Sequence, residues 1–211
     1  MCGIVGYAGP RRATPILLEG LKRLEYRGYD SAGIAVGQAG GEAPGSQTGR
    51  GGRLAVVKKT GKIAALRSEV PPELPGSWGI GHTRWATHGG VTDANAHPHL
   101  DASGKIAVVH NGIIENYRSL RSMLEKEGVR FASETDSEVI PHLVAKYYSG
   151  DLEAAVKEAI ARLEGTYAVA VIHSGEPGRI VGARNGGPLV VGVGDGEMFL
   201  ASDVTAMIAH T

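Results

Sequence analysis

Cys2, the only cysteine in 211 residues, directly follows the initiator methionine. If Met1 is removed, this residue carries both a thiol and a free α-amino group. A thiol with a pKa of about 8.5 is mostly protonated at neutral pH, so a catalytic thiol needs a base. An α-amine with a pKa of about 7.7–8.0 can take that proton, directly or through a water, and later return it to a leaving amine. The position predicts a nucleophile that carries its own base, and the alternative is a small, inert buried side chain.

Two other sequence patterns could suggest a metal site or a phosphate-binding loop, but their spacing fits neither. Five histidines fall within thirty residues, and the HPH at 97–99 looks like a ligand pair: His82, His88, His97, His99 and His110. No second cysteine accompanies them and their spacing matches no familiar zinc motif, so we expect no metal site. The basic run KKTGK (58–62) lacks the GxxxxGK[ST] spacing of a phosphate-binding loop.

Composition narrows the class of protein. The chain has 22 Lys and Arg against 22 Asp and Glu, which gives no reason to expect a nucleic acid or an anionic membrane as partner. A hydrophobic content of 42% in 211 residues is enough for one large domain. The start has no basic and apolar signal segment, and no apolar run approaches the roughly 20 residues that span a bilayer. A single cysteine cannot form an intrachain disulfide. Together, these features lead us to expect a soluble cytoplasmic protein.

The elements that would position Cys2 are mainly strands. The pattern predicts a short strand at Ile34–Val36, then a glycine-rich loop from Gly37 to Gly52 that leads to another strand. Further apolar runs bounded by glycine, proline or polar residues predict strands in KIAVVHNG (105–112), TYAVAVIHS (166–174), PLVVGV (188–193) and MFLAS (198–202).

Helices are expected between these strands. Leucines at helical spacing predict one from Thr14 to about Gly28, and similar spacing predicts others at 116–128 and 151–165. A capping box, Thr135-x-x-Glu138, predicts the start of a further helix that reaches Tyr147, with Pro141 awkwardly inside it. Clustered strands, then paired helices, then more strands suit two packed sheets with helices outside them.

Six blocks in order resemble a known family: MCGIVGY, LEYRGYDSAG (24–33), GHTRWATHG (81–89), NAHPH (95–99), VVHNGIIEN (108–116) and SETDSEV (133–139). Together they resemble the glutaminase domain of the glucosamine-6-phosphate synthase family, which belongs to the class II glutamine amidotransferases. The resemblance implies an α+β fold, the four-layer αββα sandwich of N-terminal-nucleophile hydrolases. It covers nearly the whole chain apart from residues 37–52.

The resemblance also implies a role for each matching residue. Cys2 would attack the side-chain amide of L-glutamine, and the Asn111 side chain and Gly112 N–H would form the oxyanion hole. Arg84 would bind the α-carboxylate through two parallel hydrogen bonds, and Asp136 would bind the α-ammonium group. The other matching positions would contact the carboxylate (Thr87, His88), close the pocket near an ammonia path (Trp85), or support the surroundings of the nucleophile (Arg27, His97).

Some of these positions have a plainer interpretation from the residues alone. Arg84 could be a solvated loop charge and Trp85 a packing residue. Asn111-Gly112 is typical of a tight turn that ends a strand, which would also expose a backbone N–H.

In this family the domain continues with further strands and then a sugar isomerase domain that binds fructose 6-phosphate and receives the ammonia. We therefore expect residues 2–211 to be a glutaminase domain truncated at its C-terminal end, either a fragment or a short relative, with Met1 removed on maturation. No metal or cofactor is expected. The alternatives are a glutaminase domain that serves another acceptor, or a glutamine-binding or regulatory domain without turnover.

Overall fold

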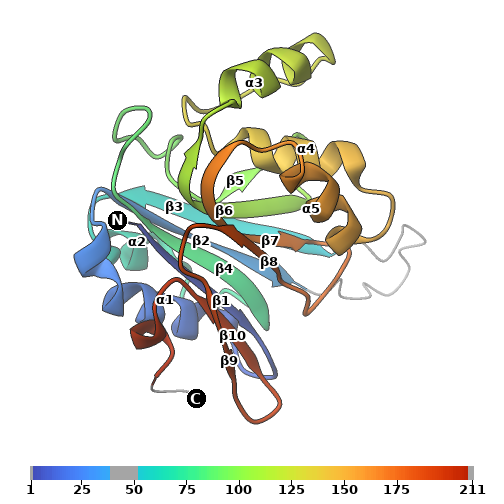
Figure 1. The fold of residues 1–211 in the computed structure, drawn as a ribbon. Helices are drawn as coiled ribbons and strands as arrows, with labels where there is room; N and C mark the ends of the chain where they lie inside the picture. Colours follow the sequence, from blue (N-terminus) through green and yellow to red (C-terminus); the bar gives the residue numbers. More distant parts are fainter. Residues whose placement is uncertain (1, 39–51, 209–211) are drawn as a thin grey trace.

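Two antiparallel β-sheets pack face to face in the computed structural model, which describes residues 2–38 and 52–208 (Figure 1). Within these residues, the first sheet has the strand order β3-β2-β4-β1-β10-β9 and the second has the order β5-β6-β7-β8. The first sheet consists of β1 (Gly3–Ala8), β2 (Ser31–Gln38), β3 (Arg53–Thr60), β4 (Trp78–Arg84), β9 (Val190–Val193) and β10 (Met198–Ala201). The second consists of β5 (His99–Leu100), β6 (Ile106–Ile114), β7 (Gly165–His173) and β8 (Val181–Asn185).

Helices cover the outer face of each sheet, so the described chain has four layers (Figure 1). The first sheet is covered by α1 (Ala13–Arg23) and α2 (Ile63–Glu69), with the 3-10 turns η1 (Glu25–Arg27) and η2 (Val204–Ala206) beside α1. The second is covered by α4 (Val139–Tyr147) and α5 (Leu152–Ile160), and α3 (Tyr117–Lys126) packs beside α4. This arrangement confirms the predicted α+β fold with αββα layers. No helix within residues 2–38 and 52–208 is long and apolar enough to cross a membrane.

The alternation of side chains along the strands explains why both faces of each sheet are apolar. Successive side chains of a strand point to opposite faces. In β1, Val5 packs with α1 and α2, whereas Ile4 packs in the layer between the sheets. In β6, Val108 packs with α3 to α5, whereas Val109 enters that same middle layer.

The same alternation makes one end of the middle layer polar. His82 and Arg84 continue the face of β4 that carries Trp78 further back along the strand, and Asn111 continues the face of β6 that carries Val109. These residues therefore point into the space between the sheets at the end where β1 begins.

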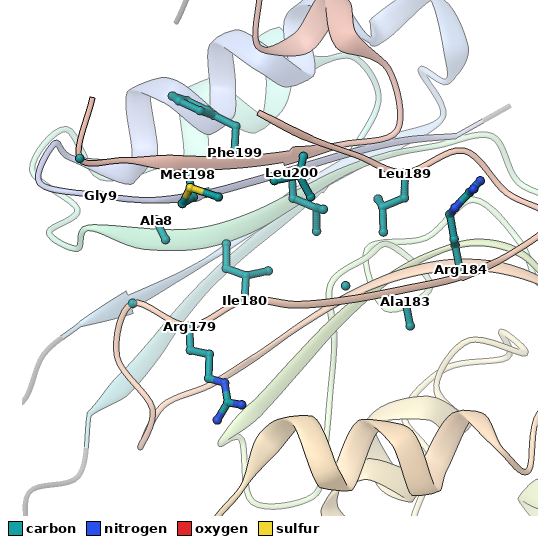
Figure 2. Close-up of a pocket in the computed structure, with 14 residues that line it drawn as sticks. Ala8, Gly9, Arg179, Ile180, Ala183, Arg184, Leu189, Met198, Phe199 and Leu200 are labelled. Carbon is teal, nitrogen blue, oxygen red and sulfur yellow. The ribbon is translucent and has the colours of Figure 1, made fainter. Parts of the chain in front are cut away.

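At the other end of β1, an apolar groove of about 760 Å³ opens between the two sheets (Figure 2). Its walls come from Ala8, from the β9 and β10 side of the first sheet, and from β8 of the second. Figure 2 shows Ile180, Leu189 and Leu200 along its length.

Several predicted element boundaries need correction. The helix predicted to reach Gly28 ends at Arg23, and the helix predicted to reach Gly165 ends at Ile160. Gly37 belongs to β2 and not to the predicted loop, while residues 39–51 of that loop lie outside the described residues.

The predicted capping box is wrong. The helix α4 begins at Val139, and the Glu138 carboxylate accepts hydrogen bonds from the backbone N–H groups of residues 132 and 133. The Thr135 hydroxyl bonds to His99 instead of capping the helix. Pro141 is the third residue of α4, where a backbone N–H has no helical acceptor, so the helix tolerates it.

The interpretation of Asn111-Gly112 as a turn is also wrong. β6 runs on to Ile114 and stays paired with β7, so both residues lie inside a strand. Gly112 has a φ of 132°, and a Cβ there would lie 2.0 Å from the carbonyl oxygen of Thr166. Only glycine fits this position, because it has the required φ and needs no room for a side chain.

Candidate active site

Strand pairing brings Cys2 next to the end of β4. Gly3 pairs with Thr83, so the residue before Gly3 lies beside Arg84 and Trp85. The backbone N–H of Trp85 donates to Cys2 Sγ at 3.2 Å, and Sγ lies 3.5 Å from the Trp85 carbonyl oxygen. Burial raises the pKa of the Cys2 thiol, opposed mainly by the hydrogen bond from Trp85 and by the Arg84 charge. The thiol is therefore protonated at neutral pH and needs a base before it can attack.

A small cavity of about 20 Å³ adjoins the thiol, with room for about one water molecule. The structure brings most of the predicted site residues together around it. They are Cys2, Arg84, Trp85, Thr87, His88, His97, Gly112 and Asp136. Three lining residues were not predicted as site residues: His110, Thr135 and Ser137.

Asn111 joins the two sheets next to Cys2. Its Nδ2 donates to the backbone carbonyl oxygen of Cys2 at 3.1 Å, and its Oδ1 lies 2.9 Å from His82 Nε2. The first contact comes from β6 of one sheet to the start of β1 in the other. The side-chain amide therefore lies against the residue that the sequence predicts as nucleophile.

The Arg84 guanidinium group is only 4% exposed and holds a loop in place. Nη1 donates to the carbonyl oxygen of Gly90 at 3.1 Å, and Nη2 donates to those of His88 and Gly89. Burial lowers the pKa of Arg84, opposed by the Cys2 sulfur in its thiolate form and by the carboxylates of Asp30 and Asp136. A carboxylate ligand would have to share or replace the carbonyl contacts, so the predicted carboxylate binding stays a prediction.

Asp136 lies on the other side of the cavity and is 4% exposed. Its Oδ2 accepts from the backbone N–H of Ile114 at 2.8 Å, and its Oδ1 accepts from the Ser137 hydroxyl at 3.3 Å. Ser137 Oγ lies 2.8 Å from His110 Nδ1. A cation and an anion thus line one cavity.

Four buried histidine rings lie in the cavity wall or directly next to it, and two of them, His97 and His110, line the cavity. The rings of His82 and His97 stack with centroids 4.2 Å apart, and His97 meets His99 edge to face at 4.5 Å. Burial lowers the pKa of His82 and of His99 to about 3 and that of His110 to about 4, and it lowers the pKa of His97 well below its usual value. All four rings are therefore neutral at neutral pH. The described residues contain no group of His, Cys, Asp or Glu arranged to hold a metal ion.

Arg27 does not reach the cavity. It forms an ion pair with Asp203, next to η2, and its Nε donates to the Tyr26 hydroxyl. Its neighbour Gly28 packs so closely on Arg84 that a Cβ there would lie 2.7 Å from the Arg84 carbonyl carbon. Arg27 can therefore support the site only indirectly, through the neighbouring backbone of Gly28, which packs against Arg84.

Comparison with known proteins identifies the family. The model of the glutamine amidotransferase domain matches residues 82–209, which include Arg84, Asn111 and Asp136. The chain belongs to the glutamine amidotransferase domain family.

Curated relatives carry the name glutamine–fructose-6-phosphate aminotransferase (isomerizing). The protein from Symbiobacterium thermophilum is 54% identical over 213 residues, and that from Thermus thermophilus is 55% identical over 212. Each comparison covers 100% of this chain and 33% of the relative. The chain therefore spans about a third of the length of these relatives.

Solved structures support the same assignment. Glutamine phosphoribosylpyrophosphate amidotransferase from B. subtilis matches with a TM-score of 0.81 and 26% identity, over 98% of this chain and 43% of that one. A structure described as the allosteric regulatory enzyme of purine biosynthesis matches with a TM-score of 0.80 and 30% identity, over the same shares of the two chains. These amidotransferases share the sandwich of this chain, which confirms the N-terminal-nucleophile type of fold.

Some of the residues at the site that were not predicted could have been found from the sequence. His82 lies two residues before Arg84 on one strand, and alternation alone places both side chains on one face. Ser137 follows Asp136 directly. Thr135 precedes Asp136 and His110 precedes Asn111 in the same way, but their place at the cavity depends on how the segment before α4 packs against β6.

Proposed function

We propose that this domain hydrolyses L-glutamine to glutamate and ammonia with Cys2 as nucleophile, after removal of Met1. The main support for this proposal is that Cys2 lines a cavity together with the buried cation Arg84 and the buried anion Asp136. These charges suit the α-carboxylate and α-ammonium groups of a free amino acid. Family membership supports the same substrate class.

The proposed reaction has two steps. The α-amine of Cys2 takes the thiol proton, sulfur bonds to the side-chain amide carbon, and the carbon–nitrogen bond breaks as the nitrogen receives that proton and leaves as ammonia. Water then attacks the γ-glutamyl thioester, the α-amine takes a proton from that water, and the carbon–sulfur bond breaks as sulfur receives this proton, which leaves glutamate and the free thiol. Because burial raises the pKa of the thiol, the reaction needs such a base beside the sulfur.

In both steps negative charge develops on the oxygen of the amide or thioester. Asn111 Nδ2 and the Gly112 backbone N–H are the proposed donors to it, and such donors act in the transition state. Thr87 and His88, on the loop that Arg84 holds, would contact the α-carboxylate. His97 supports the surroundings of the nucleophile through its place in the cavity wall.

The ammonia would be used to convert fructose 6-phosphate into glucosamine 6-phosphate by a sugar isomerase domain, normally part of the same polypeptide. The name shared by relatives that are 54 and 55% identical supports this acceptor. One solved structure that shares the fold carries a different compound in its name, phosphoribosylpyrophosphate, at a lower identity of 26%. This difference in identity favours fructose 6-phosphate over another acceptor.

The test is to incubate the purified protein with glutamine and fructose 6-phosphate and to assay glutamate and amino sugar separately. Intact mass, measured first, should show the loss of Met1. We expect this chain to form glutamate and free ammonia but no amino sugar. None of the residues in the proposed mechanism binds a sugar phosphate. Failure to form glutamate from a chain with a free Cys2 amine would favour a glutamine-binding domain without turnover, and amino sugar would overturn the proposed division between two domains.

A further inference from the structure

His82 contacts the side chain of Asn111 from the opposite sheet. The imidazole is fully buried, and its Nε2 lies 2.9 Å from Asn111 Oδ1. On the other side of the amide, Asn111 Nδ2 donates to the Cys2 carbonyl oxygen at 3.1 Å. One amide group thus lies between a histidine of β4 and the backbone of the nucleophile.

These two contacts define how the amide is oriented. A backbone carbonyl oxygen can only accept, so the atom of Asn111 that faces Cys2 must be Nδ2. The atom that faces His82 is then Oδ1, which also can only accept, so His82 Nε2 must carry the hydrogen. Rotating the amide by half a turn would place an oxygen against the Cys2 carbonyl and an NH₂ group against the N–H of His82, and both contacts would become repulsive.

We propose that His82 is a positioning residue for glutamine hydrolysis: its Nε2–H fixes the Asn111 amide with Nδ2 toward the reacting centre. The inference rests on the proposed function, because it gives a role to the orientation of the oxyanion donor. Nδ2 carries two hydrogens, and the contact with Cys2 uses one of them. The second is the donor that would serve the oxyanion.

The surroundings of His82 hold the ring in this position. The ring of His97 stacks on it at 4.2 Å with an interplanar angle of 23°. His97 is held in turn, because its Nδ1 accepts from the His110 backbone N–H at 3.2 Å. Of the two ring nitrogens of His82, Nε2 makes the side-chain hydrogen bond to Asn111, whereas Nδ1 faces the backbone of His110 without the geometry of a full hydrogen bond.

Four variants test the inference by steady-state glutaminase kinetics: His82→Leu, His82→Gln, Asn111→Ala and the double variant His82→Leu/Asn111→Ala. His82→Leu removes the donor and should lower kcat about 10- to 100-fold with KM changed less than about threefold, since loss of an oxyanion donor acts on turnover. His82→Gln places an amide nitrogen as far along the side chain as Nε2, so kcat should recover to within about fivefold of the unmodified protein. In the Asn111→Ala background, His82→Leu should lower kcat by no more than about twofold further.

The double variant separates positioning from a merely structural role. If His82 only filled the space between the sheets, its loss would lower kcat by the same factor with or without Asn111, and the inference would be overturned. Failure of His82→Gln to recover kcat while its melting temperature matches that of the unmodified protein would overturn it too. If the Leu variant does not fold, His82→Asn replaces it, because the shorter amide stays polar but cannot reach Asn111.

Two reference measurements distinguish this inference from the proposed function. The unmodified protein must form glutamate, and Asn111→Ala must lower kcat. If either fails, the proposed mechanism itself is wrong and the inference falls with it. If both hold and the His82 effects are additive, the mechanism stands and only the role of His82 is refuted.

Discussion

The two ends of the layer between the sheets differ in what their side chains can do. At the Cys2 end, charged and polar groups surround a cavity of about 20 Å³, and Arg84 and Asp136 both make hydrogen bonds there. At the far end of β1, the groove in Figure 2 has about 760 Å³ and walls of mainly aliphatic side chains such as Ile180 and Leu200. Both ends are built by the same two sheets. The larger cavity has the apolar lining and the smaller one has the polar and charged groups, so cavity size alone does not identify the candidate active site.

The difference follows from side-chain types on otherwise similar strands. Along the inward face of β4, Trp78 and Ile80 give way to His82 and Arg84 within a single strand. The groove lining contains no thiol, because Cys2 is the only cysteine of the chain. Substitutions at the two ends should therefore have effects of very different size on glutamine hydrolysis.

The largest effect is expected at the nucleophile. Cys2→Ala removes the thiol that would form the thioester, so glutamate formation should fall to the background of the assay. Glutamine binding, measured by calorimetry, should persist, because Arg84 and Asp136 remain. Activity that survives in this variant would assign the chemistry to another group and break the contrast between the two ends.

The next effect is expected at the oxyanion donor. Asn111→Ala should lower kcat about 10²–10³-fold with a small change in KM, because its donor serves a charge that bound glutamine does not carry. Steady-state kinetics with glutamate detection measures both constants. A change confined to KM would show that Asn111 binds substrate and is not an oxyanion donor.

Sequence reasoning predicted the residues at this end better than their contacts. The sandwich and most of the cavity wall were predicted through resemblance, and alternation explains the shared face of His82 and Arg84. The contact of His82 with Asn111 could not be predicted, because it joins strands of different sheets. By sequence, Asn-Gly is typical of a turn, whereas here close backbone packing inside a strand requires the glycine at position 112.

Loss of the substrate's counter-charge should have a smaller effect than loss of the oxyanion donor. Asp136→Asn keeps an oxygen that can accept from the Ile114 N–H but removes the charge, so KM should rise about 30-fold, as for a lost buried charge contact of about 2 kcal/mol. Asp195→Asn is the matched control, because it removes the same charge from an exposed position near the groove end. Equal changes in the two variants would mean that net charge, and not the Asp136 contact, controls binding.

Acid should destabilise the polar end through its histidines. Burial holds their pKa values below the ordinary value of about 6.5, to about 3 for His82 and about 4 for His110. The unfolded chain therefore binds more protons as pH falls below about 6.5, and each such histidine removes up to about 1.4 kcal/mol of unfolding free energy per pH unit. Denaturant unfolding at pH 7.5, 6 and 5 measures this slope, which should become shallower in His97→Leu. A stability that stays constant over this range would contradict the neutral, buried state of the rings.

The smallest effect is expected at the groove. Met198 lines it and is 46% exposed, so Met198→Ala should leave kcat and KM of glutaminase within about twofold. Its unfolding free energy should fall by less than about 1 kcal/mol, since a half-exposed side chain has little buried area to lose. A loss of activity as large as that of Asn111→Ala would remove the distinction between the two ends.

Covalent labelling tests the central claim, that Cys2 is the nucleophile of a glutamine site, most directly. The protein would be incubated with a diazo-ketone analogue of glutamine and examined by intact mass and peptide mapping. One adduct per chain at Cys2 is expected, with protection by excess glutamine and no adduct in Cys2→Ala. Labelling at another residue, or labelling of Cys2 that glutamine does not slow, would contradict the account.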